Sequence, residues 1–160
     1  MNKADLLHRI IAQLTHNLAV LLNGAKTAHE ASTSSENIPD NKYETLALEA
    51  SYVAQGQANR AQEIRAALEL YKQLTLRQFD YDTAIRLTAL VTLEAGNGAT
   101  RTVFIGPLEG GLKLSAGPVE IIVITPGSPL GEDLIGKRVG DVVEVGTGNN
   151  RAEYEIVEVC

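Results

Sequence analysis

The chain has 160 residues, of which 44% are hydrophobic, and it carries a formal net charge of −6 with a pI near 5.1. This length allows one domain or two small ones with a packed core, while the acidic balance argues against a protein whose main task is to neutralise a phosphate backbone. The single cysteine, Cys160, excludes an intrachain disulfide, and without a signal-peptide pattern or an apolar run of about 18 residues we expect a cytoplasmic protein with no membrane contact.

Two long helical patterns open the chain. In residues 5–28, apolar side chains recur at alternating spacings of four and three, which is the heptad pattern of a helix that packs along another helix. A looser stripe of the same kind runs through residues 46–71, with Gln57 and Gly56 weakening its centre. Only about a dozen residues separate the two patterns, so we predict an antiparallel coiled-coil hairpin. The first stripe consists of Leu7, Ile11, Leu14, Leu18, Leu21 and Ala25, and the second of Leu46, Ala50, Val53, Gln57, Ala61, Ile64, Leu68 and Tyr71.

The tip of this predicted hairpin, near residues 31–44, is acidic. Residues 30–49 contain Glu30, Glu36, Asp40, Glu44 and Glu49 against a single lysine. Asp40 suits a helix N-cap and Glu44 suits the positive end of a helix dipole, and on the pattern alone this structural explanation is favoured. Carboxylates at the end of a long rod are also hard oxygen ligands that can share a Mg²⁺ held by another protein. Both interpretations remain open.

After residue 77 glycine and proline become frequent and strand patterns replace helical ones. Strands are predicted over residues 84–93, 102–105, 119–124, 141–145 and 152–159, with tight turns at 96–98 and 146–150. A short helix is predicted within residues 131–136. These elements indicate an α+β chain with domains at 1–78 and 79–160, the second built on a small antiparallel sheet.

No motif in the sequence builds a self-sufficient active site. The "GPLEGG" run at residues 106–111 lacks the setting and spacing of a nucleotide-binding loop, and Ser128 is followed by Pro129 rather than by a nucleophile-elbow turn. We therefore expect the protein to lend groups to another protein's chemistry and not to act as an enzyme itself.

The C-terminal sequence is far more specific. "ITPGSPLGEDLIGKRVGDVVEV", residues 124–145, resembles the C-terminal signature of the bacterial Gre transcript-cleavage factors, GreA and GreB, and "AEYEIVEV", residues 152–159, resembles that family's last strand. The resemblance implies an N-terminal antiparallel coiled coil that enters the secondary channel of RNA polymerase. It also implies a C-terminal domain that is similar to FK506-binding proteins and docks at the rim of the channel.

The resemblance assigns roles to two groups of residues. Asp40 and Glu44, with Glu36 as an alternative partner, would act at the tip as catalytic acids that help to hold a second Mg²⁺ of the polymerase, which then hydrolyses the 3′ end of backtracked nascent RNA. The Mg²⁺ would be shared, with no cofactor bound stably by the protein alone. The segment that would contact the polymerase comprises Ser128, Pro129, Leu130 and Gly131, and the residues expected in the core comprise Leu134, Ile135, Val139 and Val142.

The tip departs from the family pattern. Gre factors carry Asp and Glu three residues apart, whereas here Tyr43 stands three residues after Asp40 and Glu44 comes one residue late. Tyr43 either packs on the hairpin end or contacts RNA or polymerase, and packing is favoured. The altered spacing keeps open a regulator or inhibitor that occupies the channel without stimulating cleavage. A third alternative is a binding protein similar to the regulator of nucleoside diphosphate kinase, but the long heptad stripe argues against its much shorter coil. We expect a monomer.

Overall fold

The computed structural model describes residues 2–33 and 41–160, with side chains described for 2–24 and 51–160. The chain divides into two compact units, one of residues 10–72 and the other of residues 1–9 together with 73–160. The predicted limits of 1–78 and 79–160 stay a prediction. No helix in the described part of the chain is both long enough and apolar enough to cross a membrane.

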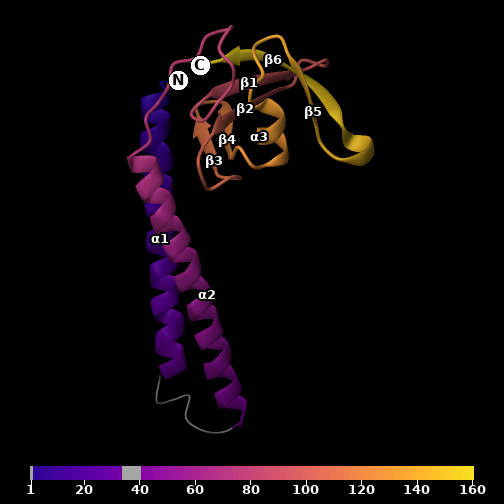
Figure 1. Ribbon diagram of the computed structural model, residues 1–160. Helices are drawn as coiled ribbons and strands as arrows, with labels where there is room; N and C mark the ends of the chain where they lie inside the picture. The colour runs from indigo at the N-terminus through magenta and orange to yellow at the C-terminus, as the bar shows by residue number, and fades with distance from the viewer. Residues whose placement is uncertain (1, 34–40) are drawn as a thin grey trace. The chain divides into compact units, whose positions relative to one another are not determined.

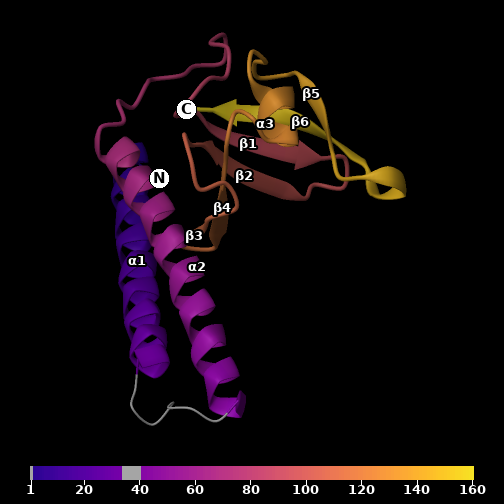
Figure 2. The same ribbon diagram turned by 60° about the horizontal axis from the view of Figure 1, so that its bottom comes forward.

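The helical unit contains two long helices, α1 (Lys3–Thr33) and α2 (Asn41–Lys72). They run antiparallel and side by side in both ribbon views (Figures 1 and 2), as the sequence predicts. The fully buried side chains of α2 recur at heptad spacing because only one stripe of each helix faces its partner. Among the described side chains of this unit, the buried ones are those of Ile10, Leu14, Ala61, Ile64, Ala67, Leu68 and Tyr71.

The predicted stripes are correct in part. Ile10 is fully buried, whereas its predicted neighbour Ile11 is only half-buried, and Val53 is exposed. Gln57 lies against Gly24, where an added Cβ would be 2.8 Å from the Gln57 Nε2 atom. The Gln57 Oε1 atom is buried and has no hydrogen-bond partner within the described residues. A buried polar atom without a partner costs free energy, so the Gln57 side chain weakens this level of the hairpin.

The second unit is built on a six-stranded sheet with the strand order β3-β4-β2-β1-β6-β5. The sheet is mixed, because β2 and β4 pair in parallel while the other neighbours are antiparallel; the prediction of an antiparallel sheet is wrong at this pair. The FK506-binding-protein-like label stays a prediction. The elements are β1 (Leu90–Ala95), β2 (Thr100–Ile105), β3 (Lys113–Ala116), β4 (Val119–Ile124), α3 (Pro129–Leu134), β5 (Val142–Val145), the 3₁₀ turn Gly148–Asn150 and β6 (Ala152–Val159).

Local sequence signals place most of these elements correctly. The β1–β2 hairpin closes at residues 96–98, where the Gly98 N–H donates to the Ala95 oxygen at 2.9 Å and Gly98 has a φ of +86°, which suits glycine. The strand β3 was not predicted, and the strand predicted over residues 84–93 begins only at Leu90. The short helix predicted within 131–136 is present as α3, beginning two residues earlier.

One face of the sheet and α3 enclose the main core of this unit. Side chains that alternate along the strands point to this face, which is why Val91, Val103 and Ile156 are buried together. Of the predicted core residues, Leu134 is fully buried and Val139 packs at the edge, but Ile135 is 38% exposed and Val142 is 50% exposed. Val142 pairs with Glu155 on the opposite face of the sheet, and Ile135 is the C-cap of α3.

The first turns of α1 belong to the sheet unit and are attached to it by two cationic side chains. The Lys3 ammonium donates to the main-chain oxygens of Arg77, Thr88 (2.8 Å) and Cys160 (3.0 Å), and lies 4.8 Å from the centre of the Phe79 ring. Burial lowers the pKa of Lys3, an effect that Cys160 partly offsets. The Arg9 guanidinium donates to the Ser115 oxygen at 2.6 Å. Lys3 therefore joins the start of α1 to the segment after α2 and to Cys160, which directly follows β6.

Replacing Lys3 with methionine is expected to lower the free energy of unfolding by about 2 kcal/mol, because the aliphatic stem remains while carbonyl oxygens lose a charged donor. Urea unfolding measures the change. The matched control is Lys72→Met, which removes an exposed ammonium near the end of α2. Equal urea concentrations at the unfolding midpoints of Lys3→Met and Lys72→Met would contradict a stabilising role for the Lys3 hydrogen bonds.

Candidate functional site

The segment from Ser128 to Gly131 forms the start of α3, and local hydrogen bonds fix its shape. Ser128 is the N-cap, with extended backbone at φ −71° and ψ 157°. Its Oγ atom accepts from the Gly131 N–H at 3.1 Å and donates to the Thr125 oxygen at 2.7 Å. Pro129 occupies the first helical turn, where its fixed φ suits the helix and no N–H is needed. The segment is thus a capped helix start, and the hydrogen bond from Ser128 to the Thr125 oxygen closes the turn before it.

The four residues of this segment differ in what they present to solvent. Gly131 is buried, and a Cβ on it would lie 1.9 Å from the Thr125 oxygen, so only glycine fits. Leu130 is half-buried and packs against the main core, and Ser128 is half-buried in its cap hydrogen bonds. Pro129 is the one exposed residue of the four. The segment therefore offers Pro129 and the outer part of Leu130 for contact with another protein.

A groove of about 450 Å³ lies beside this segment, between α3 and the β5–β6 connection. The groove is apolar along Pro129, Leu130 and Val145, and charged at Asp133 and at the pair formed by Glu144 and Arg151, whose atoms are 3.5 Å apart. Both members of that pair are more than half exposed, so the ion pair contributes little to stability. The residues that line the groove are Pro129, Leu130, Asp133, Glu144, Val145, Gly146, Thr147 and Arg151.

Sequence reasoning missed the contribution of the β5–β6 connection to this groove. It predicted the turn at residues 146–150, and Gly146 does adopt a φ of +110°. The approach of this turn to α3 depends on contacts between segments distant in the sequence. A turn signal gives no information about such contacts, so no local pattern marks Thr147 or Arg151 as groove residues.

The predicted acidic tip is not tested by the structure. Glu36 and Asp40 lie outside the described residues, and Glu44 lies in the first turn of α2, with its side chain outside the described set. The roles assigned to these three residues stay predictions. Among the side chains that the structure does describe, no group of three histidine, cysteine or acidic residues is placed to hold a metal ion.

The sequence of this chain is similar to those of known transcription elongation factors. Residues 82–160, which include α3 and the groove, match the family model described as "Transcription elongation factor, GreA/GreB, C-term". The chain is 26% identical over 148 residues to "Transcription elongation factor GreA" from Syntrophus aciditrophicus (strain SB), covering 92% of this chain and 86% of that protein.

Solved structures give a similar list. The chain matches the GreA factor homolog 1 (Gfh1) protein of Thermus thermophilus with 23% identity and a TM-score of 0.40, covering 96% of this chain and 94% of that one. It matches Thermus aquaticus Gfh1 with 24% identity and a TM-score of 0.41, covering 98% of this chain and 92% of that one. These values describe a distant likeness.

Proposed function

Because the chain belongs to the Gre superfamily of transcription elongation factors as a divergent member, we propose that it binds RNA polymerase through the secondary channel and promotes cleavage of backtracked RNA. It acts as an accessory factor, and the polymerase performs the hydrolysis. The observation that carries this proposal is the match of residues 82–160, within which the capped Ser128–Gly131 segment and its groove form a surface suited to a partner.

The helical unit supplies the reach that the proposal requires. The helices α1 and α2 contain 31 and 32 residues, so each is about 45 Å long at a rise of about 1.5 Å per residue. The connection between them carries Glu36 and Asp40, and Glu44 follows within the first turn of α2. Helices of this length also argue against similarity to the regulator of nucleoside diphosphate kinase, for which a short coil is expected.

The acids of the tip have the donor chemistry that a shared Mg²⁺ requires. Mg²⁺ prefers oxygen ligands and is commonly held by one or two carboxylates together with phosphate oxygens of the substrate. Two such ions about 4 Å apart stabilise the attacking and the leaving oxygens of a phosphodiester. In this proposal Asp40 and Glu44 donate carboxylate oxygens, with Glu36 as the alternative partner of Asp40.

One observation favours a second function, in which the protein occupies the channel without stimulating cleavage. Since α2 begins at Asn41, positions 43 and 44 both have helical backbone, and a shift of one residue changes the position around a helix axis by about 100°. Positions 41 to 44 are therefore helical and contain no loop that would compensate for the late Glu44. In this second function the helical hairpin would block nucleotide entry or perturb the catalytic Mg²⁺ of the polymerase.

A cleavage assay decides between these functions. The full chain is added to a stalled, backtracked elongation complex that carries a 3′-labelled transcript and Mg²⁺, and release of short 3′ fragments is measured against the polymerase's own rate. Release well above that rate supports the cleavage factor. No stimulation, combined with slower nucleotide addition or competition with a Gre factor, supports the channel-blocking regulator. If the protein neither stimulates cleavage nor interferes with the polymerase, both proposed functions are wrong.

Binding through the groove is tested by Pro129→Glu. Pro129 is exposed, and glutamate is favoured in the first turn of a helix, so the variant is expected to fold normally. We expect polymerase binding to weaken about tenfold, because a charge replaces an apolar contact at the interface. The control is Gln78→Glu, an exposed position outside the groove with the same change of charge. Unchanged affinity in Pro129→Glu, measured by fluorescence anisotropy, would remove Pro129 from the contact surface.

A further inference from the structure

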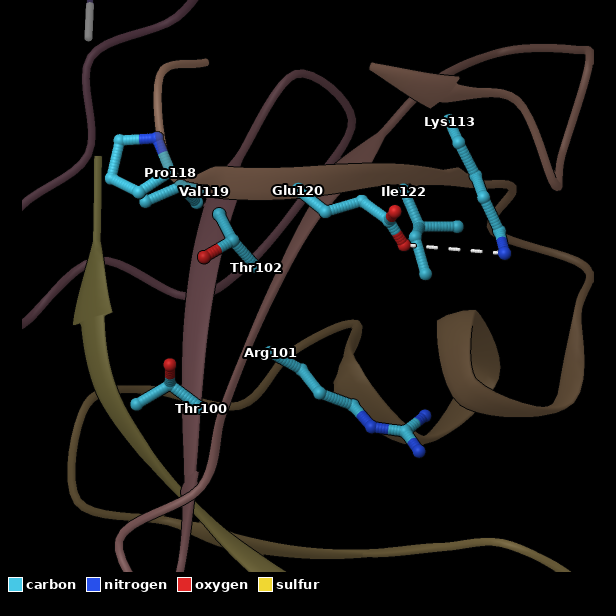
Figure 3. A pocket seen from close by; sticks show the side chains of 8 residues that line it. All are labelled: Thr100, Arg101, Thr102, Lys113, Pro118, Val119, Glu120 and Ile122. Carbon is cyan, nitrogen blue, oxygen red and sulfur yellow. Dashed lines mark ion pairs between the residues drawn. The ribbon is translucent and has the colours of Figure 1, made fainter. Parts of the chain in front are cut away.

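A second hollow lies on the sheet unit and shares no lining residue with the groove beside α3. Its volume is about 610 Å³, and it lies at the end of the sheet where β2 and β4 begin and β3 ends, with Lys113 at the start of β3 also in its lining. Figure 3 shows its lining side chains, which come from these three strands and from the β3–β4 turn. This volume falls within the range of about 300 to 1,000 Å³ that is typical of small-molecule sites. The lining residues are Thr100, Arg101, Thr102, Lys113, Pro118, Val119, Glu120 and Ile122.

Strand register gives this hollow a charged side. Lys113 is directly opposite Ile122, and Ile122 is directly opposite Val103, so these residues share a face of the sheet. Arg101 stands two residues before Val103 and Glu120 two residues before Ile122, which places both on the same face. Figure 3 shows the side chains of Arg101, Lys113 and Glu120 extending in the same general direction. Two cationic groups and one carboxylate therefore gather here, in a chain whose net charge is −6.

Both cationic groups remain available to a ligand. The Arg101 guanidinium lies 5.6 Å from the centre of the buried Tyr154 ring, which orients it, and it forms no ion pair with any residue that the structure describes. The Lys113 ammonium is 4.0 Å from Glu120, with both side chains at least 60% exposed. An ion pair that long and that exposed is weak, so an incoming anion can compete for the ammonium.

The other side of the hollow is suited to the uncharged part of a ligand. Thr100, Thr102 and Val119 alternate with the charged residues along β2 and β4, so they reach the hollow from the opposite face at the sheet corner. Val119 is 44% exposed and stands next to Pro118, which gives an apolar wall, and the threonines add hydroxyl groups. The hollow thus combines a cationic side with a partly apolar side that can form hydrogen bonds.

We propose that this hollow binds a small organic anion with a single phosphate or carboxylate group joined to an apolar body. The planar fork of Arg101 matches the geometry of either group, and Lys113 adds a point charge. Glu120 would repel a second negative charge placed near Lys113, which favours a ligand with one anionic group. The hollow is of small-molecule size, so a small ligand fits it better than a flat macromolecular contact does.

Nuclear magnetic resonance titration of the full chain tests this proposal. The probes are adenosine monophosphate, benzoate and inorganic phosphate, added at physiological salt, while amide signals of residues 100–102, 113 and 120 and the Arg101 side-chain N–H are followed. We expect saturable shifts with at least one organic probe and weaker binding of inorganic phosphate, which has no apolar body. Tighter binding of adenosine monophosphate assigns the phosphate class, and tighter binding of benzoate assigns the carboxylate class.

Variants locate the binding. Arg101→Gln is expected to weaken the affinity about tenfold, because a charge-assisted hydrogen-bonding partner is lost, and Lys113→Gln provides a second variant that leaves the Tyr154 contact intact. The control Arg86→Gln has the same change of charge at an exposed position outside the hollow, and it should bind as the original chain does. Equal losses in all three variants, or no saturable shift with any probe, would overturn the proposal. Binding of an RNA or an acidic peptide alone, dependent on Arg101, would also overturn it and assign the surface to a macromolecule.

Discussion

Replacing Gly131 with alanine is expected to destabilise the sheet unit by about 3 kcal/mol, the largest stability effect that the described residues predict for a single methyl group. The added Cβ would lie 1.9 Å from the Thr125 oxygen and 2.9 Å from both the Thr125 carbonyl carbon and the Ser128 Oγ atom. The closest neighbour is main chain in the turn that Ser128 closes, so no flexible side chain can move aside. The start of α3 must shift, and the groove beside it shifts with it.

Thermal unfolding of the full chain measures this effect, and polymerase binding should weaken in parallel. The matched control is Gly127→Ala in the same segment, where an added Cβ meets no atom within 4 Å and the backbone has no positive φ. If Gly131→Ala unfolds at the same temperature as Gly127→Ala, the tight approach of Thr125 to Gly131 is not present in solution. A parallel loss of binding would then need a separate cause.

The double variant Asp40→Ala/Glu44→Ala is expected to reduce stimulated RNA cleavage at least about 100-fold, to the polymerase's own rate, if the protein is a cleavage factor. Affinity for polymerase should change little, because the proposed contacts at Ser128–Gly131 are untouched. The control is Glu63→Ala/Glu69→Ala, which removes two exposed acids from the far part of α2 and has the same change of charge. Normal cleavage by the tip variant would show that the acids have been assigned wrongly.

A further pair of variants identifies the partner of Asp40. The single changes Glu36→Ala and Glu44→Ala are compared in the same cleavage assay. A large loss in Glu44→Ala makes Glu44 a ligand despite its altered spacing. A small loss there, combined with a loss in Glu36→Ala alone, transfers the role to Glu36. These outcomes bear on the tip, while Pro129→Glu bears on docking, so failure of one proposal is distinguishable from failure of the other.

Local patterns predicted the elements of this chain better than they predicted how the elements pair. The helices, the turn at Gly98 and the short helix α3 follow from periodicity, glycine conformation and capping, which act within a few residues. The parallel pairing of β2 with β4 joins strands that are separated by β3, and no local signal encodes it. The strand β3 is only four residues long, and its alternating Leu114 is too short a pattern to detect.

Burial was harder to predict than secondary structure for the same reason. Val142 is apolar and lies in a strand, yet its register with Glu155 turns it to the exposed face. For the candidate site, the sequence located the Ser128–Gly131 segment through its resemblance to a family, but the groove beside it and the hollow at Arg101 arise only when distant strands meet. Lys3 gives no signal of its contacts, since its acceptors are main-chain oxygens that carry no sequence pattern.

The attachment of Lys3 bears on the order in which the chain can fold during synthesis. Lys3 emerges from the ribosome well before one of its acceptors, Cys160, which is 157 positions later. The helical hairpin has contacts of shorter range and can form once α2 has emerged, whereas the sheet unit must wait for β6 and only then receive the start of α1. Contacts of such long range slow folding, so the nascent chain is expected to present a finished hairpin before its sheet unit closes. During that interval, a chaperone that recognises exposed apolar strands would find the apolar side chains of β1, β2 and β4 still uncovered.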